Sequence, residues 1–245
     1  MPLPEFNFKG NKFWTSAGAL KNNLSVKLLL CSLVIGLLAG YGALAFRILI
    51  AKTQLLSYGF EDELVVSGTA DVPWWQIMLI PVAGGLIIGL FLKYVVPENR
   101  IQGVADVIES ALVRKGKMKL WPGITSFIAS GVSLGAGGSG GREGPVVHFA
   151  AMLGSQVGQR LRLPSRYYPT LIACGVASGV AASFNAPIAG MFFALEVVLG
   201  SMASRAVAPI VLSSVVGTVA DRGTCRQWLF SYSLDFCFSV FLKAA

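Results

Sequence analysis

Charged residues are scarce in this sequence. Only 13% of its 245 residues are Asp, Glu, Lys or Arg, about half the share found in soluble domains. Hydrophobic residues make up 54%, and the mean hydropathy is +0.67. This balance is too apolar for an ordinary soluble domain and too poor in charge for a disordered chain. The composition therefore predicts a membrane protein, whose unit of length is the bilayer span.

Cysteine and histidine are also rare. The four cysteines are scattered without a Cys-x-x-Cys pair, which argues against a zinc site and a disulfide framework. The one histidine, His148, cannot build a multi-histidine metal centre. We therefore expect no metal and no cofactor. The net charge of +8 lies mostly between apolar runs, so we expect a role in membrane topology and no nucleic-acid partner.

Two apolar runs, residues 28–50 and 74–96, are long enough to cross a bilayer. Lysines precede the first run, and Arg and Lys follow the second. The segment between the runs carries the acidic residues Glu61, Asp62, Glu63 and Asp71. By the positive-inside rule, this alternation predicts a cytoplasmic N-terminus. Glycines four residues apart, at Gly36/Gly40 and Gly85/Gly89, predict close helix contacts within one bundle.

From Trp121 onward the apolar pieces become shorter and are separated by Gly, Pro and single charges. They are residues 124–136, 145–157, 168–182, 186–199 and 207–220. Short helices at membrane depth are tolerated only where protein or water covers their ends, and paired short segments are typical of transporters and channels. We therefore expect an all-α polytopic membrane protein with tilted, interrupted helices.

The glycine-rich segment 135–145 admits three interpretations. Its glycines match a GxGxxG pattern, but a dinucleotide fingerprint must follow a strand, and this segment follows a predicted membrane helix. Its Gly-Gly-Ser-Gly resembles the GxSG of rhomboid proteases, with Ser139 as nucleophile and His148 as base. Because that family takes its histidine from a separate later helix, an intramembrane serine protease is kept only as an alternative.

The third interpretation is an anion site. Pro145 suits the first turn of a helix, and the glycines let backbone come close to a ligand. A helix that starts near Glu143 would direct free N–H groups and partial positive charge at an anion. The Glu143 carboxylate could occupy that position itself and leave it when protonated. The alternative for Glu143 is an ion pair with Arg142, which we consider weaker because neighbours in sequence rarely face each other.

These residues resemble the CLC family of chloride channels and proton-coupled chloride exchangers. The resemblance covers residues from about 25 to about 220 and rests on three motifs in the right order: Gly141-Arg-Glu-Gly-Pro145 with the following residues 146–155, Ser183-Phe-Asn-Ala-Pro-Ile-Ala-Gly190, and Phe192-Phe-Ala-Leu-Glu196. It implies two inverted halves and a homodimer with one anion path per subunit. It also implies that Glu143 is the external gating glutamate and that Gly141, Arg142, Gly144 and Pro145 line the anion site.

The sequence departs from the family pattern at two sites. Residues 101–105 take the place of the family's GSGIP loop, so Gln102, Gly103 and Val104 are the expected anion ligands there, with Gln102 replacing a serine. An amide can still donate to an anion. Val197 occupies the position of the internal glutamate of many exchangers, which favours passive conduction. We expect Glu196 to be a buried structural residue, with a proton path as the alternative.

The resemblance implies a longer membrane domain than this chain holds. We therefore expect an N-terminal half, truncated or frame-disrupted, with a cytoplasmic segment 1–24, a transmembrane domain 25–220 and an atypical tail 221–245. The expected function is chloride transport across a bacterial inner membrane, without enzymatic activity. We expect the chain to conduct poorly alone. The alternatives are the protease and a fragment that does not conduct.

Overall fold

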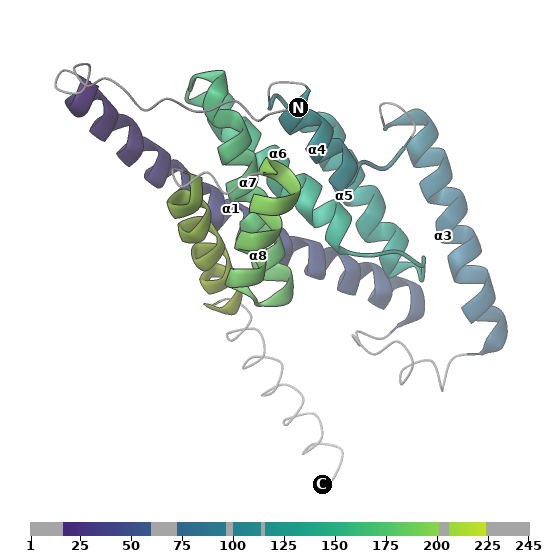
Figure 1. Cartoon of the computed structure of the whole chain (residues 1–245). Coiled ribbons are helices and arrows are strands. Elements are labelled where there is room, and N and C mark those ends of the chain that lie inside the picture. The colour runs from purple at the N-terminus through teal and green to yellow at the C-terminus, as the bar shows by residue number, and fades with distance from the viewer. Residues whose placement is uncertain (1–16, 60–72, 97–99, 114–115, 201–205, 224–245) are drawn as a thin grey trace, which may run out of the picture.

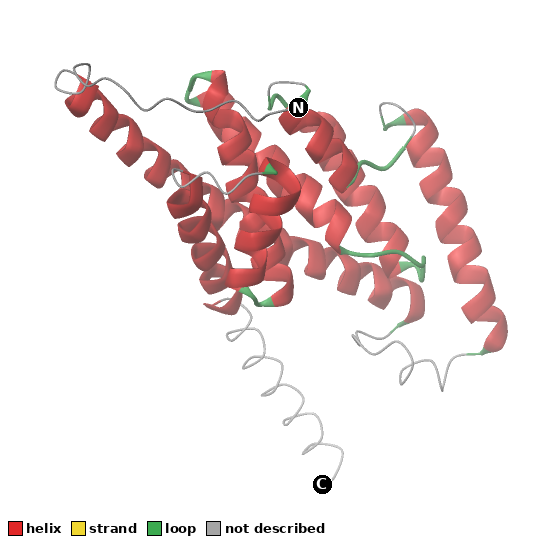
Figure 2. Ribbon diagram, viewed as in Figure 1, coloured by secondary structure: helices red, strands yellow, loops and turns green. Residues whose placement is uncertain are grey.

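The regular structure of the chain is helical. The computed structural model describes residues 17–59, 73–96, 100–113, 116–200 and 206–223, and within these ranges it contains helices and loops without a strand (Figure 2). The expected all-α class is confirmed. In chain order (Figure 1) the helices are α1 (Ala17–Tyr58), α3 (Trp74–Tyr94), α4 (Val104–Leu112), α5 (Leu120–Gly135), α6 (Glu143–Arg160), η3 (Ser165–Tyr167), α7 (Tyr168–Phe184), α8 (Pro187–Phe193), the π-helix η4 (Ala194–Leu199) and a last helix, Ala206–Gly223.

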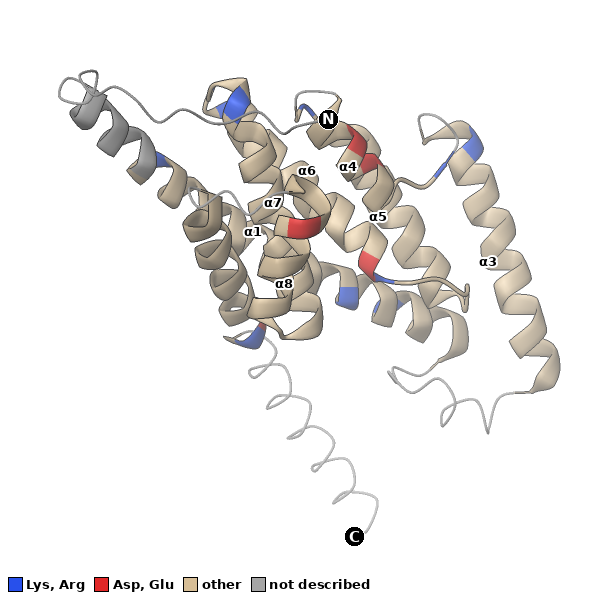
Figure 3. Cartoon of the chain, viewed as in Figure 1, with Lys and Arg blue, Asp and Glu red and all other residues tan. Residues whose placement is uncertain are grey.

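Four of the described helices are long and apolar enough to cross a membrane: Val26–Tyr58, Trp74–Tyr94, Ser165–Phe184 and Ala206–Gly223. The first two confirm the spans predicted at 28–50 and 74–96, although α1 extends beyond its predicted span at both ends. Charged residues are few along the described helices, and long stretches of helix between them contain none (Figure 3). This distribution is that of a multi-pass membrane protein.

The core of the bundle is α7. Every residue from Leu171 to Ala182 is buried, and α7 lies between α1, α6 and α8 (Figure 1). Small residues allow this close packing. A Cβ on Gly175 would collide with the backbone oxygen of Ala150 on α6, and a Cβ on Gly154 of α6 would collide with the backbone oxygen of Leu171. The α6 and α7 backbones therefore touch directly.

The first glycine pair behaves as predicted. A Cβ on Gly36 would lie 2.8 Å from the oxygen of Ser213, and one on Gly40 would lie 2.7 Å from the oxygen of Gly217. These glycines bring α1 against the helix Ala206–Gly223.

The second glycine pair behaves differently. No described atom lies within 4 Å of a Cβ on Gly85 or Gly89, and the contact of α3 is made instead by Gly84, where a Cβ would lie 2.5 Å from that of Ala136. The prediction of close contacts at Gly85/Gly89 is thus wrong for the described chain. It fails because α3 lies at the edge of the bundle and presents most of its apolar surface outward (Figure 1).

Short, interrupted helices follow Trp121, as expected. Helix α7 ends at Phe184, because the next residue, Asn185, has a φ of +56°, and α8 begins at Pro187. Helix α8 then continues into η4, which ends at Gly200 with φ of +59°. A glycine or asparagine in this left-handed conformation is a common helix stop. The breaks leave α8 and η4 as short helices that could not each cross a membrane alone.

Candidate anion-binding site

The loop between α5 and α6 holds the predicted gate region. After Gly135 the chain turns at Gly137, where φ is +88°, and the N–H of Gly138 donates to the oxygen of Ser133 at 2.8 Å. The hydroxyl of Tyr58 donates to the oxygen of Ala136 at 3.3 Å, which holds the loop against the C-terminal end of α1. These contacts fix the approach to α6 and therefore the position of its first turn.

Helix α6 begins at Glu143, and Pro145 lies in its first turn, as predicted. The Glu143 side chain is half-buried and turns back over Gly141, where an added Cβ would lie 2.5 Å from Oε2 of the glutamate. Arg142 is exposed, and among the described residues it forms no ion pair with Glu143. A negative group at a helix N-terminus is stabilised by the free N–H groups and the helix dipole.

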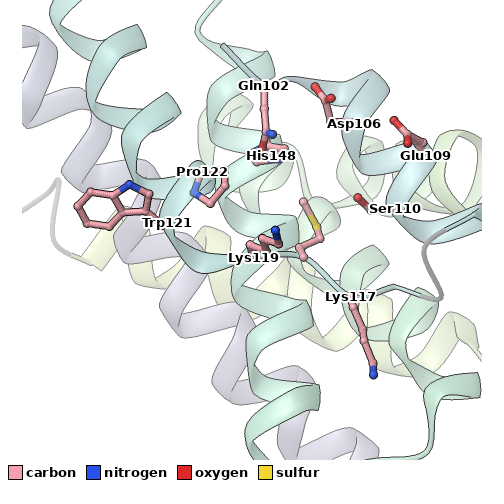
Figure 4. A pocket seen from close by; sticks show the side chains of 10 residues that line it. Gln102, Asp106, Glu109, Ser110, Lys117, Lys119, Trp121, Pro122 and His148 are labelled. Atoms are coloured by element: carbon pink, nitrogen blue, oxygen red, sulfur yellow. The ribbon is translucent and has the colours of Figure 1, made fainter. Parts of the chain in front are cut away.

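A cavity of about 360 Å³ lies on the side of α6 (Figure 4). Three parts of the chain form its walls: α4 with the residue Gln102 before it, the segment 117–122 before and within α5, and α6. Helix α4 contributes Asp106, Glu109 and Ser110, and α6 contributes His148. This cavity brings together residues that are up to 46 positions apart in sequence, from 102 to 148.

The backbone at the start of α4 already has hydrogen-bond partners. The N–H of Gln102 donates to Oγ of Ser126 at 3.2 Å, and the N–H of Gly103 donates to Oδ2 of Asp106 at 2.8 Å. Nη2 of Arg100 donates to Oδ1 of Asp106 at 2.6 Å. Burial alone would raise the pKa of Asp106, but these two donors outweigh it and lower the pKa below its usual value. For an anion in the cavity, the Gln102 side-chain amide is therefore the donor that remains at this position.

Ser155 holds the opposite wall of the cavity in place. Its hydroxyl accepts the N–H of Met118 at 2.9 Å and donates to the oxygen of Gly116 at 2.6 Å. The amides of Gln156 and Gln159 donate to the oxygen of Met118 at 2.7 and 3.1 Å. Because these contacts come from α6, the segment that carries Lys117 and Lys119 is fixed relative to that helix.

His148 is the buried polar residue of this cavity. It is 2% exposed, and its Nδ1 has no hydrogen-bond partner among the described residues. Ser139 is exposed in the α5–α6 loop and makes no hydrogen bond with His148 within the described chain. The nucleophile–base pair that a serine protease requires is therefore not formed between these two residues.

The structure places the other predicted site residues in two groups. Gly103 and Val104 lie at the start of α4, and Gly144 and Pro145 lie half-buried in the first turn of α6, outside the cavity walls. Glu196 lies exposed in η4, so the expectation that it is a buried structural residue is wrong for the described chain. Whether its side chain is buried or exposed depends on which helices pack against η4, and the sequence pattern does not show this.

Two residues at this site were not predicted. Asp106 caps α4 from its third position, a signal visible in sequence as an acidic residue three positions after Gly103. The sequence indicates His148 only as a protease base, because nothing local in the sequence shows that α4 packs beside it.

These features define a polytopic membrane protein built from interrupted helices, and the comparisons with known proteins identify its family. The family model described as voltage gated chloride channel matches residues 84–241. The chain is 34% identical to a ClcB-like chloride channel protein of Ralstonia nicotianae over 77% of this chain and 45% of the relative. It is 31% identical to the voltage-gated ClC-type chloride channel ClcB of Escherichia coli over 86% of this chain and 51% of the relative.

Solved structures agree with this assignment. A CLC-type fluoride/proton antiporter is similar with a TM-score of 0.61 and 31% identity, over 83% of this chain and 47% of that one. A slow cyanobacterial Cl⁻/H⁺ antiporter is similar with a TM-score of 0.63 at 22% identity, over 80% of this chain and 46% of that one, and this likeness shows the fold alone. The chain belongs to the voltage gated chloride channel family, that is, to the CLC proteins.

The chain spans about half the length of the curated relatives it matches. The family match continues past Ala220 to residue 241 and so includes most of the segment set apart as a tail. Residues 224–245 lie outside the described residues, and the division into segments stays a prediction.

Proposed function

We propose that this chain forms part of a chloride transport path across a cell membrane, with Glu143 as its gate. The observation that carries the proposal is the position of the Glu143 carboxylate at the first residue of α6, half-buried and turned back over Gly141. A helix N-terminus favours either a carboxylate or a diffusible anion. The two therefore compete for one position, and protonation removes the carboxylate from the competition.

The space beside the gate supports this competition. No described atom lies within 4 Å of a Cβ built on Gly144, so open space adjoins the first turn of α6. Backbone of Gly141, Arg142, Gly144 and Pro145 surrounds the position at which an anion would bind. Gln102, Gly103 and Val104 form the second group of anion ligands, at the start of α4.

Chloride is the proposed ion because both of the curated relatives described above are named as chloride channels. The name of a similar antiporter includes fluoride, so fluoride is the alternative ion. Val197 stands where many exchangers have a glutamate, which favours passive conduction over proton exchange. Glu196 is then the remaining candidate for a proton path, from an exposed position on η4.

The proposed location is the bacterial inner membrane with a cytoplasmic N-terminus. Helices α3 and α6 both end on the side of the bundle where α1 begins (Figure 1), and their last turns carry Lys93 and Arg160. Basic residues at one end favour the cytoplasmic side for that end. Glu143 then faces the outer side. The full-length protein is proposed to be a homodimer.

Chloride binding to the purified chain tests the proposal without requiring a complete path. Calorimetric titration in lipid nanodiscs is expected to show tighter binding by the wild type at acidic than at neutral pH. In Glu143→Gln, affinity at neutral pH is expected to be about tenfold higher and independent of pH, because a charge at a helix end is worth up to about 2 kcal/mol. Wild-type pH dependence in Glu143→Gln contradicts the gate.

Flux supplies the second readout. Because we expect the chain to conduct poorly alone, chloride efflux from reconstituted vesicles is expected to be slow, but on acidification it should rise above that of protein-free vesicles, and this pH dependence should be lost in Glu143→Gln. Glu196→Gln is the comparison variant, since it removes the carboxylate of the alternative proton path, away from the gate. Loss of pH dependence in Glu196→Gln alone would assign the proton-sensitive group to η4. A fluoride-selective electrode in the same vesicles distinguishes the two ions.

A further inference from the structure

The segment that joins α6 to α7 is strongly basic. It carries three exposed arginines, Arg160, Arg162 and Arg166, and the sequence has no Asp or Glu between Glu143 and Glu196. Within the described chain, none of the three arginines forms an ion pair or a side-chain hydrogen bond with another residue. Their guanidinium groups are therefore open to an anion from outside the chain.

The arginines lie at the surface of the membrane. The membrane-spanning helix Ser165–Phe184 begins within this segment, so the residues just before it lie where the chain leaves the apolar layer. Leu161 stands between Arg160 and Arg162 and is 57% exposed. Basic residues beside an exposed apolar one are typical of segments that lie in the headgroup layer of a bilayer. The anions nearest to these arginines are therefore the phosphates of lipids.

The end of α6 holds Arg162 in a conformation that favours glycine. The N–H of Leu163 donates to the oxygen of Gly158 and the N–H of Arg162 to the oxygen of Gln159, both at 3.1 Å. This is the Schellman pattern of a helix end, in which glycine usually occupies the position of Arg162. Here φ of Arg162 is +49°, which costs free energy for a residue with a Cβ. The arginine is unfavourable for the fold, so a contribution from its side chain is needed to offset the cost.

Arg166 is also placed against its electrostatic preference. It lies at the start of the helix Ser165–Phe184, and the N-terminal end of a helix carries partial positive charge that repels a cation. Its Cζ lies 4.8 Å from the centroid of the Tyr167 ring, and this stacking holds the plane of the guanidinium in place. An anion here is attracted both by the guanidinium and by the helix end. A phosphate fits best, because its oxygens accept two parallel hydrogen bonds from one guanidinium.

We propose that the segment 160–166 binds the headgroup of an anionic phospholipid. The lipid phosphate accepts hydrogen bonds from Arg162 and Arg166, Arg160 adds positive charge, and Leu161 contacts the acyl chains. The partner is a lipid and not free phosphate, because the segment lies at the membrane surface and supplies an apolar contact beside the charges. None of these residues belongs to the gate or lines the cavity, so the inference does not depend on the proposed chloride path.

Native mass spectrometry of the purified chain tests this binding. The chain is incubated in detergent with equal amounts of phosphatidylglycerol and phosphatidylcholine that have the same acyl chains, so that the two lipids differ in headgroup alone. The wild type is expected to retain phosphatidylglycerol about tenfold or more over phosphatidylcholine, since each arginine near an anionic lipid contributes about fivefold. Equal retention of the two lipids overturns the inference. Displacement of the lipid by inorganic phosphate at the same concentration would show a site for free phosphate and also overturns it.

Arg162→Gly separates lipid binding from stability. Because glycine suits a positive φ, this variant is expected to melt a few degrees higher than the wild type while its preference for phosphatidylglycerol falls about fivefold. Arg166→Gln is expected to lower the preference by a similar factor. Lys52→Gln is the matched control, since it removes one exposed positive charge from α1, and it should keep the full preference. Full preference in Arg162→Gly, or an equal loss in Lys52→Gln, contradicts a site on this segment.

Discussion

Arg47 and Asp221 form an ion pair that joins the first and the last described helices. Nη2 of Arg47 lies 3.4 Å from Oδ2 of Asp221 and also donates to the oxygen of Ala182, near the end of α7, at 3.3 Å. Asp221 is buried, and the charge of Arg142, next to the gate, also acts on it. The pair therefore ties three helices together at the end of the bundle where α6 begins.

Removing one member of this pair is expected to destabilise the chain. Arg47→Ala leaves a buried carboxylate without its guanidinium, so the free energy of unfolding should fall by about 3 kcal/mol. The double variant Arg47→Leu with Asp221→Leu removes both charges and should recover at least half of that loss. Denaturant titration in detergent micelles measures both. A double variant no more stable than the single one would show that the pair contributes little.

The contact between α6 and α7 gives a second prediction. Gly175→Ala should lower the free energy of unfolding by about 2 kcal/mol or more, because the added methyl group collides with backbone at Ala150 and neither helix can move away easily. Gly89→Ala is the control, since nothing described lies within 4 Å of its Cβ. It should leave stability unchanged or raise it by up to about 1 kcal/mol through helix propensity. Melting curves that rank the two variants the other way contradict the packing.

Properties that depend on neighbouring residues in sequence could be predicted. The spans at 28–50 and 74–96, the broken helices after Trp121 and the start of α6 near Pro145 all follow from local hydropathy, glycine and proline. Hydropathy does not give the ends of α1, because the helix continues past its most apolar stretch, from Ala17 to Tyr58.

Properties that depend on which helices meet could not be predicted. Gly36 and Gly85 have the same spacing to a second glycine, but only the first faces another described helix. His148 lines a cavity because α4, a nine-residue helix too short to recognise by hydropathy, packs beside α6. The sequence indicates a polar residue on an apolar helix but does not reveal what lies opposite.

Because the pKa of Asp106 is lowered in the folded chain, part of the free energy of unfolding should be lost in acid. Its pKa is lowered in the folded chain, so the ionised carboxylate stabilises the fold at pH values above the unfolded pKa of about 3.9, and this contribution is lost as the pH falls through the lower, folded pKa. Asp106→Asn should cost about 1 kcal/mol near neutral pH, and the difference from wild type should shrink below about pH 4. Thermal unfolding as a function of pH measures this.

A companion variant separates the cap from the ion pair. Arg100 is half-exposed, with 52% of its side chain accessible, so its salt bridge with Asp106 is expected to contribute little. Arg100→Gln should therefore cost less than Asp106→Asn. A larger loss in Arg100→Gln would assign the stability to the ion pair instead of the hydrogen bond from the N–H of Gly103.

The glycines on either side of Glu143 give opposite predictions for chloride binding. An added Cβ at Gly141 would lie 2.5 Å from Oε2 of Glu143, which is the far end of a flexible side chain and can move. Gly141→Ala should therefore displace the carboxylate from the helix end without unfolding the chain. Chloride affinity at neutral pH should then rise severalfold toward that of Glu143→Gln, because a competing charge at the helix N-terminus is weakened.

Gly144→Ala should act in the other direction. Its added methyl group meets no described atom within 4 Å and so leaves the carboxylate where it is, but it fills the open space in which the anion is proposed to bind. Chloride affinity should fall at both neutral and acidic pH, with the pH dependence kept. Calorimetry on the two variants at both pH values distinguishes displacement of the gate from obstruction of the site. If both substitutions change affinity in the same direction, the anion and the carboxylate do not share the position that the gate requires.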